Sequence, residues 1–371
     1  MFESAAEPAR ERRLSEVSLV LQDKRHRGVL PWLVSIAILI TIMVSIGGIT
    51  RLTGSGLSIT DWKPIMGAIP PLTDLDWQET FAKYQASPQG TQVNHQMALP
   101  EFKFIFFWEY FHRLVGRLIG FVSLVPLVYF WARKKISRRL AGRVLIGVAL
   151  GGLQGALGWF MVKSGLVDLP AVSHFRLAAH LGLALFILAY FVWLIQDFRT
   201  GRSAISVENP ARIRSLKTHF SALRALFILQ IAYGAFVAGL KAGFGFNTFP
   251  KMAGQWFPGN FWALDPAWIN PFENPASVQW IHRTLGWCVL VTAAAFLFRV
   301  RRAAVPREIR IWGASLGHMT FVQFLLGVAT LVLVVPIPLA VLHQFGAALI
   351  VILLTGTTHA FSRLKADRTS G

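Results

Sequence analysis

Eight long apolar segments constrain the fold of this chain more than any other feature. Each is long enough to cross the roughly 30 Å hydrocarbon layer of a membrane as a helix. They make the 371-residue chain 54% hydrophobic, with a mean hydropathy of +0.50. Because lipid offers the backbone no hydrogen-bond partner and the segments lack the period of two of barrel strands, we predict an all-α membrane protein. The predicted transmembrane helices are 30–49, 104–130, 144–162, 172–195, 221–240, 278–298, 311–335 and 339–360.

Basic residues indicate how these helices are oriented. Of the 37 Lys and Arg residues, 26 lie in five segments that fall on one side if the chain crosses the membrane eight times. By the positive-inside rule, both termini are predicted to be cytoplasmic. The same clustering in short loops explains the net charge of +19 without a nucleic-acid ligand. The five segments are 1–28, 133–143, 199–224, 299–310 and 363–371.

Cysteine usage and the first residues bear on the cellular compartment. Cys288 is the single cysteine and lies inside an apolar segment, so no intrachain disulfide is expected. Residues 1–28 mix acidic with basic side chains, unlike the acid-poor transit peptides of organelles. We therefore expect a multi-pass protein of a bacterial inner membrane.

Two predicted outer loops, 51–103 and 241–277, are long and rich in Pro, Trp and Phe. They are expected to lie on the outer membrane surface, either as lids or as anchoring loops. Within the first, Trp77, Phe81 and Tyr84 are spaced like one face of a short interfacial helix.

Four histidines sit near the start of apolar segments in two recurring contexts. His112 and His282 lie in E-Y-F-H-R and Q-W-I-H-R, whereas His180 and His343 lie in A-A-H-L-G and L-H-Q-F-G. An imidazole in hydrocarbon is costly unless it is ligated or paired, which favours axial ligation of haem iron. An interhelical hydrogen bond is the alternative for any single one. Three histidines near the cytoplasmic ends have no matched partner and are predicted to be structural: His219, His318 and His359.

The matched contexts indicate an internal duplication. We predict two four-helix halves, 29–196 and 219–362, joined by a cytoplasmic linker, 197–218, and flanked by cytoplasmic segments 1–28 and 363–371. Four helices return the chain to the same side, so the halves should be parallel repeats related by an axis along the membrane normal. One pair of histidines per half, near the outer side, would clamp one flat macrocycle in each bundle.

Charged neighbours of the histidines suggest how a haem would be held. Arg113 and Arg283 directly follow their histidines, and haem propionates would satisfy them. Snorkelling to lipid phosphate is the alternative. Arg117 and Arg176 occur only in the first half, where His174 is also a candidate for holding a substrate.

Glu109 makes the two halves unequal. It lies three residues before His112 on the same helix face, and the corresponding residue of the second half is Gln279. A partly buried carboxylate beside a haem ligand can take up protons during an oxidation or stabilise a cationic intermediate. A structural ion pair with Arg113 or a loop lysine is the alternative.

With these residues in view, the chain resembles the haem A synthase family, in the form found in mitochondria and proteobacteria. The resemblance runs from the first predicted helix to the last. It is carried by G-G-I-T-R-L-T-G-S-G-L-S-I-T-D-W at 47–62, E-F-K-F-I-F-F-W-E-Y-F-H-R-L-V-G-R at 101–117, R-L-A-A-H-L at 176–181, Q-W-I-H-R at 279–283 and the His343-Gln344 pair.

The resemblance implies an activity and a division of labour. The family oxidises the methyl group at position 8 of haem O to a formyl group, by way of an alcohol and a geminal diol, and so makes haem A for cytochrome oxidases. By resemblance, His282 and His343 would hold a haem b cofactor, while His112 and His180 would receive haem O as substrate. The family's glutamate near the first histidine corresponds to Glu109.

The resemblance also suggests partners. Haem O synthase and cytochrome oxidase assembly factors are expected partners, and the protein is expected to contact membrane lipid. The sequence does not decide whether the protein forms a homo-oligomer. Many Gram-positive relatives carry a cysteine pair in the first outer loop, and residues 51–103 contain none. A thiol relay at that loop is therefore excluded for this chain.

Three other functions compete with this expectation. A diheme electron-transfer cytochrome would use the same histidines but has no evident need for Glu109. A transporter would fit the repeat, although its helices would be interrupted at mid-membrane depth. A prenyl-transferring haem O synthase would need paired Asp-rich motifs for magnesium and diphosphate, which the sequence lacks.

Overall fold

The computed structural model describes residues 27–60, 69–165, 172–200, 205–207 and 210–366. Its long helices are α2 (Val29–Leu52), α5 (Leu99–Ala132), α6 (Arg138–Gly165), α7 (His174–Thr200), α8 (Pro210–Gly239), α10 (Pro275–Arg302), α11 (Arg307–Val332) and α12 (Ile337–Ser362). The shorter elements are α3 (Asp74–Gln85), α4 (Pro88–Gln92), the 3₁₀ turns η2 (Ala242–Phe244) and η3 (Ala267–Ile269), α9 (Asn270–Glu273) and the strands β1 (Ile205–Val207) and β2 (Leu364–Ala366).

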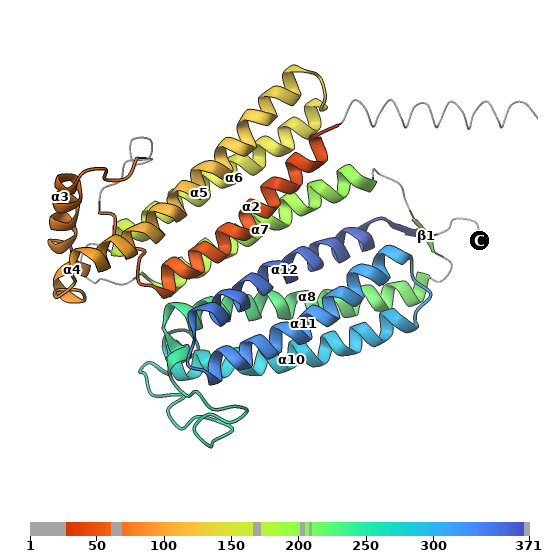
Figure 1. The fold of residues 1–371 in the computed structure, drawn as a ribbon. Coiled ribbons are helices and arrows are strands. Elements are labelled where there is room, and N and C mark those ends of the chain that lie inside the picture. Colours follow the sequence, from red (N-terminus) through yellow and green to blue (C-terminus); the bar gives the residue numbers. More distant parts are fainter. Residues whose placement is uncertain (1–26, 61–68, 166–171, 201–204, 208–209, 367–371) are drawn as a thin grey trace, which may run out of the picture.

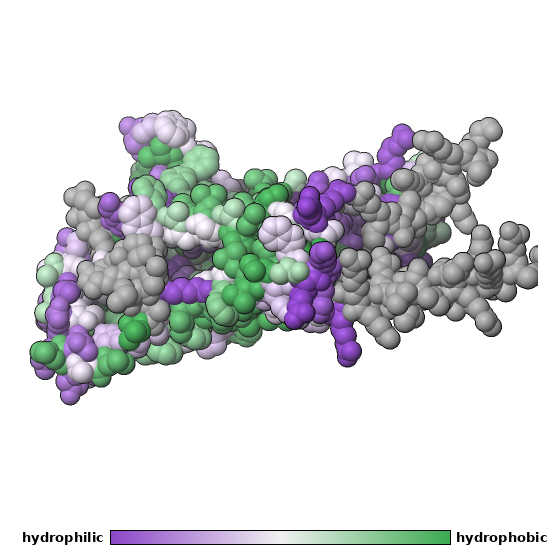
Figure 2. Space-filling view, turned by 90° about the horizontal axis from the view of Figure 1, so that it is seen from above, coloured by the Kyte–Doolittle hydropathy of each residue, from purple (hydrophilic) through white to green (hydrophobic). Residues whose placement is uncertain are grey.

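Eight of the described helices are long and apolar enough to cross a membrane, which confirms the predicted all-α membrane fold. They run beyond the apolar cores that the sequence marks. Helix α7 continues to Thr200 and α8 begins at Pro210, so both reach into the predicted linker 197–218. Figure 2 shows hydrophobic residues across the middle of one face, with hydrophilic residues gathered toward the end where the chain termini lie.

Each set of four consecutive long helices closes into a ring. In the first half α2 contacts α5, α5 contacts α6, α6 contacts α7, and α7 returns to α2. In the second half α8, α10, α11 and α12 contact one another in the same order, and α12 returns to α8. Figure 1 shows the two sets side by side. The predicted relation of the halves by an axis along the membrane normal stays a prediction, as do the domain bounds.

The halves meet through α2 and α7 on one side and α8 and α12 on the other. Gln344 of α12 donates from Nε2 to the carbonyl of Val44 in α2 at 2.7 Å. At the opposite end, Asp197 of α7 accepts from Nε2 of the buried His359 at 2.9 Å and pairs with Arg143 at 2.7 Å. Strands β1 and β2 pair in parallel beside this network. His359 is thus structural, as predicted.

The first outer loop contains the helix that the aromatic spacing predicts. Helix α3 begins with a capping box in which Thr73 and Asp76 satisfy each other's backbone amides. Hydrogen bonds from the Thr73 backbone and hydroxyl hold the pKa of Asp76 below its usual value. The predicted face packs on α5, with the Tyr84 and Phe102 ring centroids 4.9 Å apart. The loop is therefore anchored on the first residues of α5.

The described chain ends lie at one end of the helical assembly, and both long loops lie at the other (Figure 1). This arrangement is what an even number of spans requires. The assignment of that end to the cytoplasm remains a prediction from charge.

Replacing Asp197 with alanine tests the contact between the halves. The buried His359 and the half-buried Arg143 would both lose their carboxylate partner, so we expect a loss of about 1–3 kcal/mol in stability and a lower thermal unfolding midpoint. Glu79→Ala is the control, because it removes an exposed pair with Lys83 worth at most about 1 kcal/mol. Equal midpoints for the two variants would mean that this network does not stabilise the fold.

Candidate functional site

The four predicted histidines come from four different helices and form two pairs. His112 of α5 and His180 of α7 belong to the first ring and lie near enough to each other to interact electrostatically. His282 of α10 and His343 of α12 belong to the second ring and interact in the same way. The structure thus brings together the partners that the repeat predicts, one pair in each half.

The imidazoles share an unusual hydrogen-bonding state. In all four, Nδ1 is buried and has no hydrogen-bond partner among the described residues. A buried polar nitrogen without a partner is costly in a fold that must otherwise satisfy its polar groups. Two facing imidazoles are also the donor set that iron in a macrocycle takes as axial ligands. The site therefore fits a haem between each pair.

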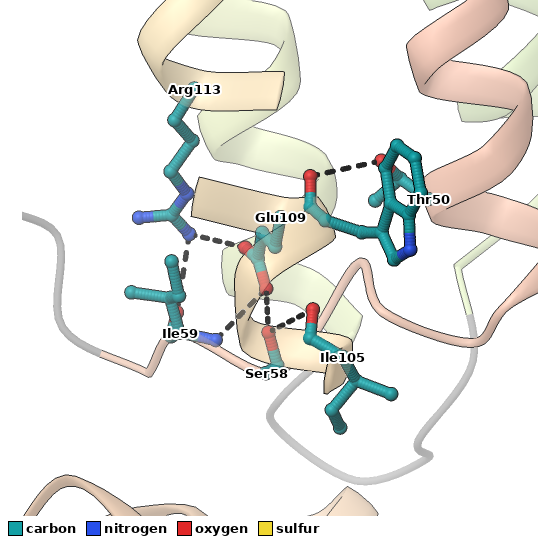
Figure 3. A network of polar contacts seen from close by, with 7 residues as sticks. Thr50, Ser58, Ile59, Ile105, Glu109 and Arg113 are labelled. Carbon is teal, nitrogen blue, oxygen red and sulfur yellow. Dashed lines mark hydrogen bonds and ion pairs between the residues drawn. The ribbon is translucent and has the colours of Figure 1, made fainter. Parts of the chain in front are cut away.

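Glu109 lies on α5, one turn before His112, and its side chain points toward the first outer loop (Figure 3). Its side chain is 3% exposed. Oε1 accepts from Nη2 of Arg113 at 2.6 Å, and Oε2 accepts from the Ser58 hydroxyl at 2.8 Å and from the Ile59 amide at 2.9 Å. Arg113 also donates to the Ile59 carbonyl at 3.2 Å. The ion pair with Arg113 that was the alternative for Glu109 is present, and it fastens the loop to α5.

The second half builds the same fastening with a neutral residue. Gln279, at the position corresponding to Glu109, donates from Nε2 to the carbonyls of Ala242 and Gly245, at 2.9 and 2.6 Å. Arg283 donates to the Gln279 side chain at 3.3 Å and to the carbonyls of Phe246 and Thr248. The Nε atom of Arg283 is buried without a hydrogen-bond partner in the described chain. The exchange of Glu109 for Gln279 therefore changes the charge of this clamp and reverses its hydrogen bonds to the loop, which Glu109 accepts and Gln279 donates.

The other predicted arginines lie near the first pair but are engaged differently. Arg117 is one turn beyond Arg113 on α5, where its charge interacts with Arg113 and Tyr110. Arg176 of α7 lies over the ring of Phe160 from α6, 4.8 Å from its centroid. Their contact with a propionate stays a prediction.

His174 lies away from the imidazole pairs, at the boundary between the halves. It is buried against α8, with its ring centroid 5.5 Å from that of Phe236. Its Nε2 lies 3.7 Å from a carboxylate oxygen of Glu273 in the second outer loop. A role of His174 in holding the substrate stays a prediction. Its contacts with Phe236 and Glu273 join the two halves.

Sequence reasoning missed the glutamines that support the ligand helices. Gln154 donates to the carbonyl of His180 at 3.0 Å, and Gln323 donates to the carbonyl of His343 at 2.8 Å. Gln230 lies 3.4 Å from Nε2 of His282. The sequence contains a pattern that could have pointed to these glutamines, a Q-x-x-x-G that recurs in three of the apolar segments.

Fold and site together define a class: an eight-helix membrane protein whose two four-helix rings each present a pair of buried imidazoles suited to haem. A family model described as "Cytochrome oxidase assembly protein" matches residues 31–355. The chain belongs to that family.

Curated relatives point to one member of the class. The "Heme A synthase" of Parvibaculum lavamentivorans is 43% identical over 88% of this chain and 92% of the relative. Those of Nitrosospira multiformis and Rhodospirillum centenum are 43% and 45% identical, each over 90% of this chain and over 93% and 88% of the relative.

Truncating Arg283 tests the loop clamp of the second half. Arg283→Ala removes the donors to the carbonyls of Phe246 and Thr248, so we expect faster hydrogen–deuterium exchange across residues 242–248. Lys251→Ala, an exposed change in the same loop, is the control and should leave the exchange unchanged. If residues 242–248 exchange as slowly in Arg283→Ala as in the parent protein, other contacts keep this loop ordered.

Proposed function

We propose that this protein acts as a haem A synthase, oxidising the C8 methyl group of haem O to a formyl group. The observation that carries the proposal is the presence of two imidazole pairs with a carboxylate beside only one of them. The relatives named for this activity cover nearly the whole chain and support it. We place the protein in a bacterial inner membrane, with both termini cytoplasmic and the haem sites toward the periplasm.

The two halves are proposed to bind two different haems. His282 and His343 would hold a haem b cofactor, with Arg283 near a propionate. His112 and His180 would receive haem O, with Arg113, Arg117, Arg176 and His174 as candidate substrate contacts. The domain bounds proposed from the sequence, 29–196 and 219–362, follow this division.

The chemistry on the substrate is a stepwise oxidation of one carbon. The methyl group becomes an alcohol and then a geminal diol, which loses water to leave the aldehyde. With water as the oxygen source, each hydroxylation releases two electrons and two protons. When bound, haem b supplies one-electron transfer.

Protein side chains would manage the protons and the position of the substrate. Hydrogen bonds from Arg113, Ser58 and the Ile59 amide hold the Glu109 carboxylate in one orientation, between its own helix α5 and the first outer loop. We propose that it stabilises positive charge that develops on the oxidised substrate or accepts a proton from it. The neutral Gln279 could do neither, which fits a second half that only holds a cofactor.

A diheme electron-transfer cytochrome is the competing function, because it needs the same four ligands. The decisive experiment incubates the purified full-length protein with haem O and an electron acceptor and then extracts its haems. Haem A among the products supports the synthase, whereas unchanged haem O supports an electron carrier. Haem O synthase and oxidase assembly factors are the partners we would seek by co-purification.

Glu109→Gln tests the carboxylate. Glutamine keeps the size of the side chain and copies Gln279, so we expect an intact fold and intact haem binding but a loss of roughly 10²-fold or more in haem A formation. Glu101→Gln is the matched control, because Glu101 is an exposed capping residue of the same helix and glutamine also serves in a capping box. Full activity in Glu109→Gln would reduce Glu109 to a structural role.

Replacing single ligands tests the division between the halves. We expect His282→Ala and His343→Ala to lose the haem that co-purifies with the protein, whereas His112→Ala keeps it. Pyridine haemochrome spectra of the purified variants measure this. If His112→Ala loses the resident haem and His282→Ala retains it, the assignment of cofactor and substrate halves is reversed.

A further inference from the structure

Each of the four imidazoles lies edge-on against a glycine of the preceding membrane-spanning helix. A Cβ added at Gly47 of α2 would lie 3.2 Å from Cε1 of His112, and one at Gly158 of α6 would lie 3.1 Å from Cε1 of His180. The corresponding distances are 3.1 Å for Gly234 of α8 against His282 and 2.9 Å for Gly327 of α11 against His343. The same ring atom meets the same residue type four times.

These contacts leave little room for a side chain. Carbon atoms in favourable contact lie about 3.5–4.0 Å apart, so a methyl group at any of the four positions would push the ring aside by several tenths of an ångström. The glycines have open neighbours elsewhere on the same helices: a Cβ at Gly151, Gly152 or Gly155 of α6 would meet nothing within 4 Å. Close approach is therefore not shared by every glycine of α6, and at Gly158 the group that comes close is the histidine.

Hydrogen bonds do not fix the orientation of these rings through Nδ1. Metal-ligating histidines usually donate from the second ring nitrogen to a carbonyl or carboxylate, and this bond sets the plane of the ring. Here all four Nδ1 atoms are buried without such a partner in the described chain. Packing is then left to define how the rings of His112, His180 and His343 are turned, whereas Nε2 of His282 also lies 3.4 Å from the Gln230 amide nitrogen.

We infer that Gly47, Gly158, Gly234 and Gly327 are positioning residues that seat the haem-ligating imidazoles. The inference rests on the proposed function, since it takes the two imidazole pairs as haem ligands. Each glycine offers a backbone surface without a side chain against Cε1 of its histidine. Three of the four lie four residues after a glutamine that contacts the same histidine: Gln154, Gln230 and Gln323.

The second half gives the cleanest test, because its haem is expected to co-purify. Gly327→Ala places a methyl group 2.9 Å from the His343 ring. We expect haem affinity to fall roughly tenfold or more, with a shifted midpoint potential and an altered low-spin visible and electron paramagnetic resonance spectrum. Alanine has a better helix propensity than glycine, so the helix itself should not be weakened.

Gly313→Ala on the same helix separates ligand positioning from simple helix packing. A Cβ there would lie 3.2 Å from a ring carbon of Phe296, a contact that is also close but belongs to no proposed ligand. If Gly313→Ala perturbs the haem spectrum and potential as much as Gly327→Ala does, the contact serves helix packing and the inference is overturned.

The first half allows a matched pair within one helix. Gly158→Ala should weaken the binding of added iron protoporphyrin, followed by spectral titration, while Gly155→Ala should bind it as the parent protein does. Equal affinities would contradict the seat at His180. His180→Ala serves as the reference: if even this variant binds iron protoporphyrin normally, the proposed haem ligation fails, which is a result distinct from failure of the glycine seat.

Discussion

The structure depends on how polar groups are satisfied in a medium that offers no hydrogen bonds. Eight helices satisfy the backbone internally, which leaves the side chains as the only polar groups to account for. Several of these, such as the hydroxyls of Thr41, Thr320 and Thr355, donate to the carbonyl of the preceding helical turn. The Nδ1 atoms of the four matched histidines are an exception among the described residues. The two histidines of each pair lie on opposite helices of a four-helix ring, which makes the site suited to a metal.

The outer ends of both halves are fastened by the same device. An arginine that follows the ligand histidine reaches back one turn to an acidic or amide side chain, and both groups bind the main chain of the outer loop. The two halves differ in the side-chain atom that binds the loop, which is a carboxylate oxygen in Glu109 and an amide nitrogen in Gln279. A charged clamp in the half of one imidazole pair and a neutral clamp in the half of the other is the simplest physical basis for the different chemistry that we propose for the two sites.

Helix α2 joins the two sites in space. Gly47 faces His112 of its own half, and the next residue, Gly48, faces the side chain of Gln344, which directly follows His343 in the chain. Gln344 in turn bonds the carbonyl of Val44. Helices α5 and α12, one from each half, thus contact adjacent residues of one helix.

The sequence by itself determined the membrane fold, the eight spans and the pairing of the histidines. The length of the apolar segments, the basic loops between them and the repeated histidine motif can be read from the chain, because they do not depend on how the helices pack. The sequence also marked Glu109 as the asymmetric residue, but it left open whether that carboxylate faced an arginine or a substrate.

Only the tertiary structure decided which groups meet. It placed Glu109 against Arg113, Ser58 and Ile59, carried His174 away from the other histidines to the contact between the halves, and set a glycine against each imidazole. Periodicity along a helix fixes which face a residue occupies, whereas the neighbour on that face depends on how helices distant in sequence are rotated against one another. That rotation is set by close packing across the whole assembly, which no local pattern encodes.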